Sequence, residues 1–444
     1  MGLLLAVGGC SVPSQRENVD VAARLVSPQV GAPLEWRLDA EDDAAALKRA
    51  EAVLGHPLSM QDAISVAFLA SPELQLALEK LEISRAELVA AMTPPNPVLV
   101  AGSRQPGGDL AAFYPDRSIS VGVLQNVIGL LNIPDRRAIA RRDLERARYE
   151  AANAAIRHAA VVAQAWFDYS AALQVQGFRE RGMSIVRLAY DNLRARPGIA
   201  PEVLASQRNS LLAEQTRVII ATQAAVKARA RLGEELGIAG WRDDWSIEAA
   251  LPPLPARDLD AAEVERLAME RRYDLQAAAK AVDARLRVLA TQKRFRWLNQ
   301  LDIGVFRDKV AGGTSFTGPN MVIELPLFDQ RQSRLLNADA LLRTEVRKLQ
   351  AARLTARTEI RSQAADLAAA RHLVEHIERE IQPTQLQQRA APGGNDPDDT
   401  RRMRLLLDSI GTDAEHADRL REYWRARSAL ALAGGDWSAL SGLR

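Results

Sequence analysis

At 444 residues the chain exceeds the usual size of one compact domain, so we expect two units or one elongated unit. Its 58 basic and 56 acidic residues leave a net charge of +2, which gives no electrostatic basis for binding nucleic acid. Aromatic residues make up only 5%, and Ala, Leu, Arg, Glu and Gln crowd long stretches, which is typical of long helices. No run of 18 apolar residues follows the first few, so the sequence offers no transmembrane helix and could cross a membrane only with strands.

The chain begins MGLLLAVGGCSVPSQ, and Cys10 is its only cysteine. An intrachain disulfide and a four-cysteine zinc site are therefore excluded, which leaves a stray buried thiol or chemistry at Cys10 itself. The short apolar run followed by two glycines resembles a bacterial lipoprotein signal, which is cut just before a lipidated cysteine. Because the run is short and lacks a basic start, we expect residues 1–9 to be a truncated signal peptide and residues 10–55 a lipidated linker.

Two copies of one pattern follow each other along the chain. Leu74 and Gln75 align with Leu275 and Gln276, and Leu88 aligns with Leu289 at the same shift. We therefore expect two structural repeats joined by a linker and followed by a short tail. The expected ranges are 56–241 for the first repeat, 242–257 for the linker, 258–437 for the second repeat and 438–444 for the tail.

Each repeat contains two alternating segments, which predict β-hairpins at 97–125 and 300–326. In SISVGV the apolar residues Ile119, Val121 and Val123 occupy one face, and we expect this face to meet lipid, together with Ile303 and Val305. Strands of about nine residues have the length that a bilayer crossing needs. Four strands are too few to close, and open edges cannot face lipid, so closure would require several chains.

Long helical hairpins follow at 134–237 and 328–433. Pro134 suits a first helical turn, and a helix of roughly 60 residues would be about 90 Å long and stable only when packed. The segment RPGIAP (196–201) breaks the first hairpin, and APGGNDPDD (391–399) breaks the second. Apolar residues of the long helices are expected to form packing seams, namely Leu204, Leu211, Leu212 and Ile219.

The order of these parts resembles the TolC family of outer-membrane efflux channels over nearly the whole chain after Cys10. The segments that carry the resemblance are PLSMQDAISVAFLASPEL (57–74), PNPVL (95–99), IELPLFDQRQSR (323–334) and REYWRARSALALAGG. The resemblance implies a mainly α fold with a small β part, built of coiled-coil hairpins and two β-hairpins per chain. It implies a homotrimer that closes into a 12-stranded β-barrel on a periplasmic α-barrel.

The family also implies partners and sites. An adaptor (membrane fusion) protein, an inner-membrane pump and outer-membrane lipid are the expected partners, and many members are lipoproteins, which places the anchor at Cys10. RPGIAPEVL resembles the family's helix-hairpin tip, where adaptors dock; the residues concerned are Arg196, Gly198, Ile199, Ala200 and Leu204. Asp396, Asp398 and Asp399 could form an acidic ring at the entrance, but Asp, Pro, Gly and Asn are also ordinary turn residues, and we favour the turn.

The function expected is passive export of small molecules or ions from the periplasm to the exterior, without catalytic residues, cofactor or resident metal. No phosphate-cradling loop is present, so energy would come from the pump. The alternative is a periplasmic coiled-coil scaffold or secretion-accessory protein without a pore. HLVEH (372–376) matches a zinc-protease pattern, but its place far along a predicted helix favours a solvated surface.

Overall fold

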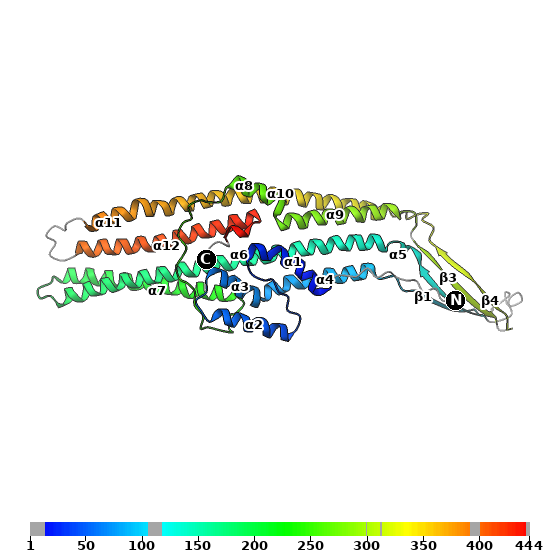
Figure 1. Ribbon diagram of the computed structural model, residues 1–444, viewed down its shortest axis with the longest axis horizontal. Coiled ribbons are helices and arrows are strands. Elements are labelled where there is room, and N and C mark those ends of the chain that lie inside the picture. The colour runs from blue at the N-terminus through cyan, green and yellow to red at the C-terminus, as the bar shows by residue number, and fades with distance from the viewer. Residues whose placement is uncertain (1–13, 105–117, 299, 311–312, 391–399, 441–444) are drawn as a thin grey trace. The chain divides into compact units, whose positions relative to one another are not determined.

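The computed structural model describes residues 14–104, 118–298, 300–310, 313–390 and 400–440. The described chain is mainly helical, with one four-stranded sheet (Figure 1). The long helices are α4 (Pro72–Met92), α6 (Ile133–Ala195), α7 (Pro201–Glu235), α9 (Tyr273–Arg294), α10 (Gln332–His376) and α12 (Thr400–Gly434). The shorter ones are α1 (Gln15–Val30), α2 (Ala40–Leu54), α3 (Met60–Ala70), α5 (Val127–Leu131), α8 (Ala261–Arg271), α11 (Gln382–Ala390), a π-helical turn η2 (Ile377–Ile381) and a 3₁₀ turn η3 (Trp437–Leu440).

The chain divides into two compact units that do not follow the two sequence repeats. The first unit takes residues up to 15, 80–147 and 277–351, and the second takes 16–79, 148–276 and 352–444. Each unit therefore combines corresponding parts of both repeats: the strands belong to the first unit, and the hairpin ends of the long helices to the second.

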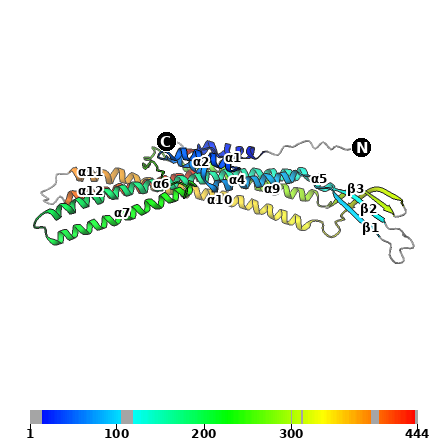
Figure 2. The same cartoon turned by 90° about the horizontal axis from the view of Figure 1, so that it is seen from below.

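The first unit contains the sheet. Strands β1 (Val98–Arg104), β2 (Ser118–Asn126), β3 (Leu301–Val310) and β4 (Ser315–Ile323) lie side by side in chain order, and all neighbours are antiparallel (Figure 2). Each β-hairpin of the sequence thus supplies two adjacent strands, and β2 pairs with β3 across the repeats. Asn126 ends β2 and caps α5, since its side chain accepts a hydrogen bond from the backbone N–H of Gly129.

The second unit has an aromatic core. The Phe167 ring of α6 stacks on Trp424 of α12 with centroids 5.9 Å apart, and Trp166 packs edge-on against Phe167. Trp166 also donates a hydrogen bond of 3.1 Å to the carbonyl of Leu58, so its indole nitrogen is satisfied although buried. These contacts join α6, α12 and the segment before α3.

Residues 10–55 differ from the linker that the sequence predicts, because they contain two helices. In α1, Val19, Ala22, Val26 and Val30 recur at helical spacing and are all buried. In α2 the side chain of Asp39 accepts hydrogen bonds from the first backbone N–H groups and caps the helix. The expected linker at 242–257 is irregular but packed, since Trp245, Ile247 and Leu251 are buried.

Across the described residues, none of the helices has both the length and the apolar character that crossing a membrane requires.

Candidate functional site

The predicted lipid-facing residues lie on one face of β2. The side chains of Ile119, Val121 and Val123 are 53%, 45% and 49% exposed, and Gly122 between them is buried. Ile303 and Val305 of β3 are also exposed, at 46% and 57%. Alternation along the strands therefore separates two unlike faces, as the sequence pattern predicts.

The register shows how this face changes along the strands. Val123 pairs with Leu99 on one side and Val305 on the other, so the row through Val123 is apolar. Val121 is paired with Arg307, and Ile119 with Lys309. Because directly paired residues share a face, the face is apolar around Val123 and becomes basic toward the ends of the hairpins.

Both outer strands of this sheet lack a second neighbour among the described residues, since the order runs β1-β2-β3-β4 and ends there. All seven residues of β1 are exposed, and most of β4 is exposed as well. Apolar side chains on these strands are exposed, such as Leu99 at 69% and Met321 at 64%. An open, apolar edge of this kind is a template for pairing with another chain.

The predicted tip lies between α6 and α7. Gly198 has φ +80°, the left-handed conformation that glycine adopts without strain, and a Cβ there would meet no atom within 4 Å. Pro201 begins α7, which suits its missing N–H. Arg196 and Ala200 are exposed, whereas Ile199 and Leu204 are half-buried.

The predicted packing seam of α7 needs correction. Leu212 and Ile219 are 51% and 69% exposed, and the buried positions of α7 as far as Ala225 are instead small or polar; only near the end of the helix is a large apolar residue, Leu232, buried. Glu214 is buried with Arg217 as its ion-pair partner, and Ala221, about two helical turns further along α7, is buried as well. The described helices of this chain therefore leave Leu212 and Ile219 uncovered, whereas Leu204 and Leu211 are half-buried.

Four predicted site residues lie outside the described residues: Cys10, Asp396, Asp398 and Asp399. The HLVEH segment is described, at the end of α10. His372 and His376 are exposed, and Glu375 is ion-paired with Arg371 at 2.7 Å and with Arg379 at 3.3 Å. The carboxylate that a zinc protease would need for proton transfer is thus already engaged by two guanidinium groups.

A buried ionic cluster surrounds Arg272, which is 8% exposed. Its guanidinium donates to Asp274 at 2.8 Å, to Glu359 at 2.8 Å and to the carbonyl of Ala433 at 2.9 Å. Burial alone would raise the pKa of Asp274, but the hydrogen bonds and charge of Arg272 outweigh it and lower this pKa below its usual value. The cluster ties the start of α9 to α10 and α12.

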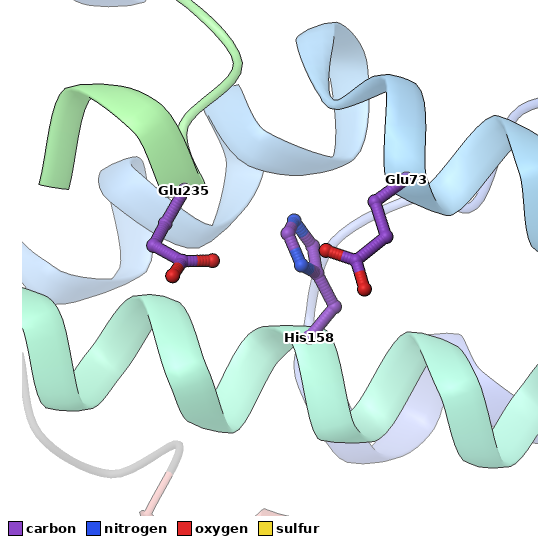
Figure 3. Close-up of side chains that lie close together, drawn as sticks. All are labelled: Glu73, His158 and Glu235. Carbon is purple, nitrogen blue, oxygen red and sulfur yellow. The ribbon is translucent and has the colours of Figure 1, made fainter. Parts of the chain in front are cut away.

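A second cluster, which the sequence patterns do not predict, is formed by Glu73, His158 and Glu235 (Figure 3). Glu73 lies in the first turn of α4, His158 lies in α6 and Glu235 ends α7. One ligand atom of each residue lies within 4.8 Å of the other two. The only sequence signal is a single histidine among alanines in AAIRHAAVV, since the three residues are far apart in the chain.

No protein-family sequence model matches the chain, and no curated protein sequence matches it. Solved structures do match. The open-state MtrE outer membrane channel of Neisseria gonorrhoeae has a TM-score of 0.67 and 14% identity, over 85% of this chain and 89% of that one. The outer membrane protein VceC of Vibrio cholerae has a TM-score of 0.63 and 14% identity, over 85% and 96%. The CmeC outer membrane channel of Campylobacter jejuni has a TM-score of 0.59 and 10% identity, over 98% and 90%.

These likenesses confirm in fold the resemblance to the TolC family that the sequence motifs predict. The chain has the fold of outer-membrane channels: long helical hairpins joined to a small antiparallel sheet.

Proposed function

We propose that this chain is the outer-membrane channel of a tripartite efflux system. Three copies would each contribute four strands to one closed 12-stranded barrel, and the helices would continue it into the periplasm. Small molecules or ions would pass through the lumen without chemical change. The observation that carries the proposal is the sheet, whose two edges are open and whose apolar side chains are exposed.

A small sheet of this kind is poorly suited to water. Sheets are stable when a face packs on a core, whereas here exposed apolar residues include Leu99, Val123, Val305 and Met321. Lipid around the barrel would cover the apolar row through Val123, and copies of the chain would pair the open edges of β1 and β4. The basic residues Arg307 and Lys309 would then lie near the membrane surface, where long cationic side chains can reach water.

A second feature of the described chain supports assembly with other copies. Leu212, Ile219 and Val226 are spaced by seven residues on α7, and they are 51%, 69% and 62% exposed. A heptad-spaced apolar stripe is the usual seam of a coiled coil. Helices of a neighbouring copy would cover it in a trimer.

The remaining parts of the proposal concern partners and anchoring. An adaptor protein would dock at the exposed RPGIAP turn, and an inner-membrane pump would supply energy and select the cargo. Cys10 would carry the lipid that anchors the amino terminus in the outer membrane. A periplasmic scaffold without a pore is the alternative, and it has no need for a sheet with open apolar edges.

The test is a membrane fractionation combined with an oligomer mass. Protein made with its native leader in a Gram-negative host should appear in the outer-membrane fraction. After extraction in detergent, its mass should be that of a trimer. Deleting residues 98–126 and 301–323 together should release it from that fraction, because these ranges contain the four strands. Retention of the strand-deleted protein as an outer-membrane trimer, with lipidation blocked, would contradict a barrel.

A further inference from the structure

His158 is a buried side chain with unused hydrogen-bonding capacity. It is 7% exposed, and its Nε2 atom has no hydrogen-bond partner in the described structure. A buried polar atom without a partner is destabilising unless something else satisfies it. Figure 3 shows the imidazole ring between the carboxylates of Glu73 and Glu235, which approach it from opposite sides.

The two carboxylates are held there by the ends of their helices. Glu235 is the last residue of α7, and Gly237 follows it with φ +75°. A Cβ at Gly237 would lie 2.7 Å from the carbonyl oxygen of Ala70, so only glycine lets the end of α7 lie this close to the junction of α3 and α4. This approach brings Glu235 to the same place as Glu73, at the start of α4.

We propose that Glu73, His158 and Glu235 form a binding site for a divalent transition-metal ion, with Zn²⁺ as the ion that fits the donor set best. One imidazole nitrogen and two carboxylate oxygens are ligands that zinc accepts, and water would complete the coordination. Two carboxylates also supply the negative charge that a dication requires. Among the described residues, this is the one group of three such side chains whose ligand atoms converge.

The distances require a small adjustment. Zinc holds nitrogen and oxygen ligands at about 2.0–2.2 Å, so neighbouring ligand atoms lie about 3.4 Å apart in a tetrahedral site. The three atoms now lie within 4.8 Å of one another, and Glu73, which is exposed, is free to rotate inward. Arg231 competes for Glu235 across 3.9 Å, but its side chain is 65% exposed and can turn into solvent.

The electrostatics of the cluster are compatible with a metal. Burial lowers the pKa of His158, although Glu73 and a hydrogen bond to the backbone of Glu235 act against this; the lowered pKa favours the neutral ring that a metal ion binds. Burial raises the pKa of Glu235; Arg231 lowers it, and the charge of Glu73 raises it further. A cation between the two carboxylates would relieve their mutual repulsion. The site would join α4, α6 and α7 and stabilise their packing independently of any channel activity.

The experiment titrates full-length protein, purified in detergent without a histidine tag, with Zn²⁺ and with Co²⁺ as an absorbing substitute. We expect one ion per chain and a higher thermal midpoint when Zn²⁺ is present. His158→Gln and Glu73→Gln should each weaken binding by at least the roughly 10-fold that the loss of an outer-shell partner costs. Glu73 is exposed, so this variant should fold even where the histidine variant does not.

The matched control is His416→Gln. His416 lies 2.9 Å from the carboxylate of Glu378 on other helices, so it tests whether any histidine beside a glutamate would serve. We expect wild-type stoichiometry and affinity for this variant. The proposal is overturned if the wild type binds no Zn²⁺ at micromolar concentration, if Glu73→Gln binds as tightly as the wild type, or if the His416 variant loses the ion instead.

Discussion

Gly198 and Gly240 form a matched pair for testing the adaptor surface at the scale of single residues. Their φ angles are +80° and +76°, and a Cβ at either position would meet nothing within 4 Å. Any substitution therefore costs about 1–2 kcal/mol of backbone strain at both positions. Only Gly198 lies in the RPGIAP turn, so a difference between the two variants reports on the turn's surface and not on strain.

We predict that Gly198→Glu forms normal trimers but loses adaptor crosslinking and export, because it adds charge and volume where a partner must approach. Gly240→Glu should retain both activities. Crosslinking yield to the adaptor and efflux rate in whole cells provide the measurements. Equal loss in the two variants would attribute the effect to strain, and normal efflux in Gly198→Glu would mean that the adaptor docks elsewhere.

A second residue-scale prediction concerns the anchor. Cys10→Ser should abolish acylation of the mature amino terminus, because a hydroxyl is not the thiol that the lipid is attached to. Trimers should still form, since most membrane affinity would come from the strands. Mass spectrometry of the amino-terminal peptide decides the matter: an unmodified Cys10 in mature wild-type protein would show that the cysteine is not an anchor.

Residues of this kind differ in how well a sequence predicts them. Gly198 is predictable because a glycine between two helical patterns is a local signal for a positive φ. The cluster around His158 is not, because residues 73, 158 and 235 come together only through the packing of three helix segments. Composition carried no sign of it: histidine is rare in the chain, and the one local motif with two histidines, HLVEH, lies elsewhere.

At the scale of elements, the strand register predicts how deep in the membrane each lipid-facing residue lies. The row through Val123 is apolar on both sides, whereas Val121 pairs with Arg307 and Ile119 with Lys309. If these basic residues mark the membrane surface, Val123 lies deepest of the three. The cost of a charge on the lipid face falls toward the surface.

We therefore predict that Val123→Arg destabilises insertion by about 2–4 kcal/mol, with smaller effects for Val121→Arg and the smallest for Ile119→Arg. Ser120→Arg is the control, because Ser120 alternates to the other face of β2. The fraction of heat-resistant trimer in outer membranes measures the effect. Equal trimer yields for Val123→Arg and Ser120→Arg would show that this face does not meet lipid.

The Arg272 cluster makes stability depend on pH. The pKa of Asp274 is lowered on folding, so its contribution is present above the ordinary value of 3.8 and is lost as pH falls through the folded pKa. Asp274→Asn should therefore cost about 1–3 kcal/mol at neutral pH, where it leaves part of a buried guanidinium unpaired. The difference from the wild type should shrink in acid.

Thermal unfolding followed by circular dichroism at pH 7 and at about pH 3 measures this dependence. Asp339→Asn is the control, since its pair with Arg343 is 3.3 Å long but lies on an exposed helix surface, where such pairs contribute little. A gap between Asp274→Asn and the wild type that is as wide in acid as at neutral pH would contradict the lowered pKa.

Helices and strands were predictable wherever apolar residues recur at a regular helical or strand spacing. Alternation located the strands, and apolar residues spaced by three and four positions located the long helices. Helices α1 and α2 were not predicted, because this segment was assigned to a linker from its place behind a signal-like sequence, although the apolar residues of α1 recur at helical spacing. The exposure of Leu212 and Ile219 was missed as well, since periodicity identifies a seam without saying which chain fills it.

At the scale of the whole molecule, the repeats of the sequence and the compact units of the structure are different divisions. Each repeat contributes to both units, because its strands join those of the other copy in one sheet. The duplication could be detected from the aligned residues alone. The pairing of β2 with β3, however, joins the first repeat to the second within one chain, and no local sequence pattern predicts such a contact. In the proposed function, the sheets of three chains would close into one membrane-spanning pore.

Electron cryomicroscopy of the full-length protein in lipid nanodiscs tests that claim most directly. We predict three copies around one axis, with β4 of each copy paired to β1 of the next, twelve strands inside the lipid disc and the row through Val123 facing outward. A different number of copies, unpaired outer strands, or strands lying outside the lipid would contradict it.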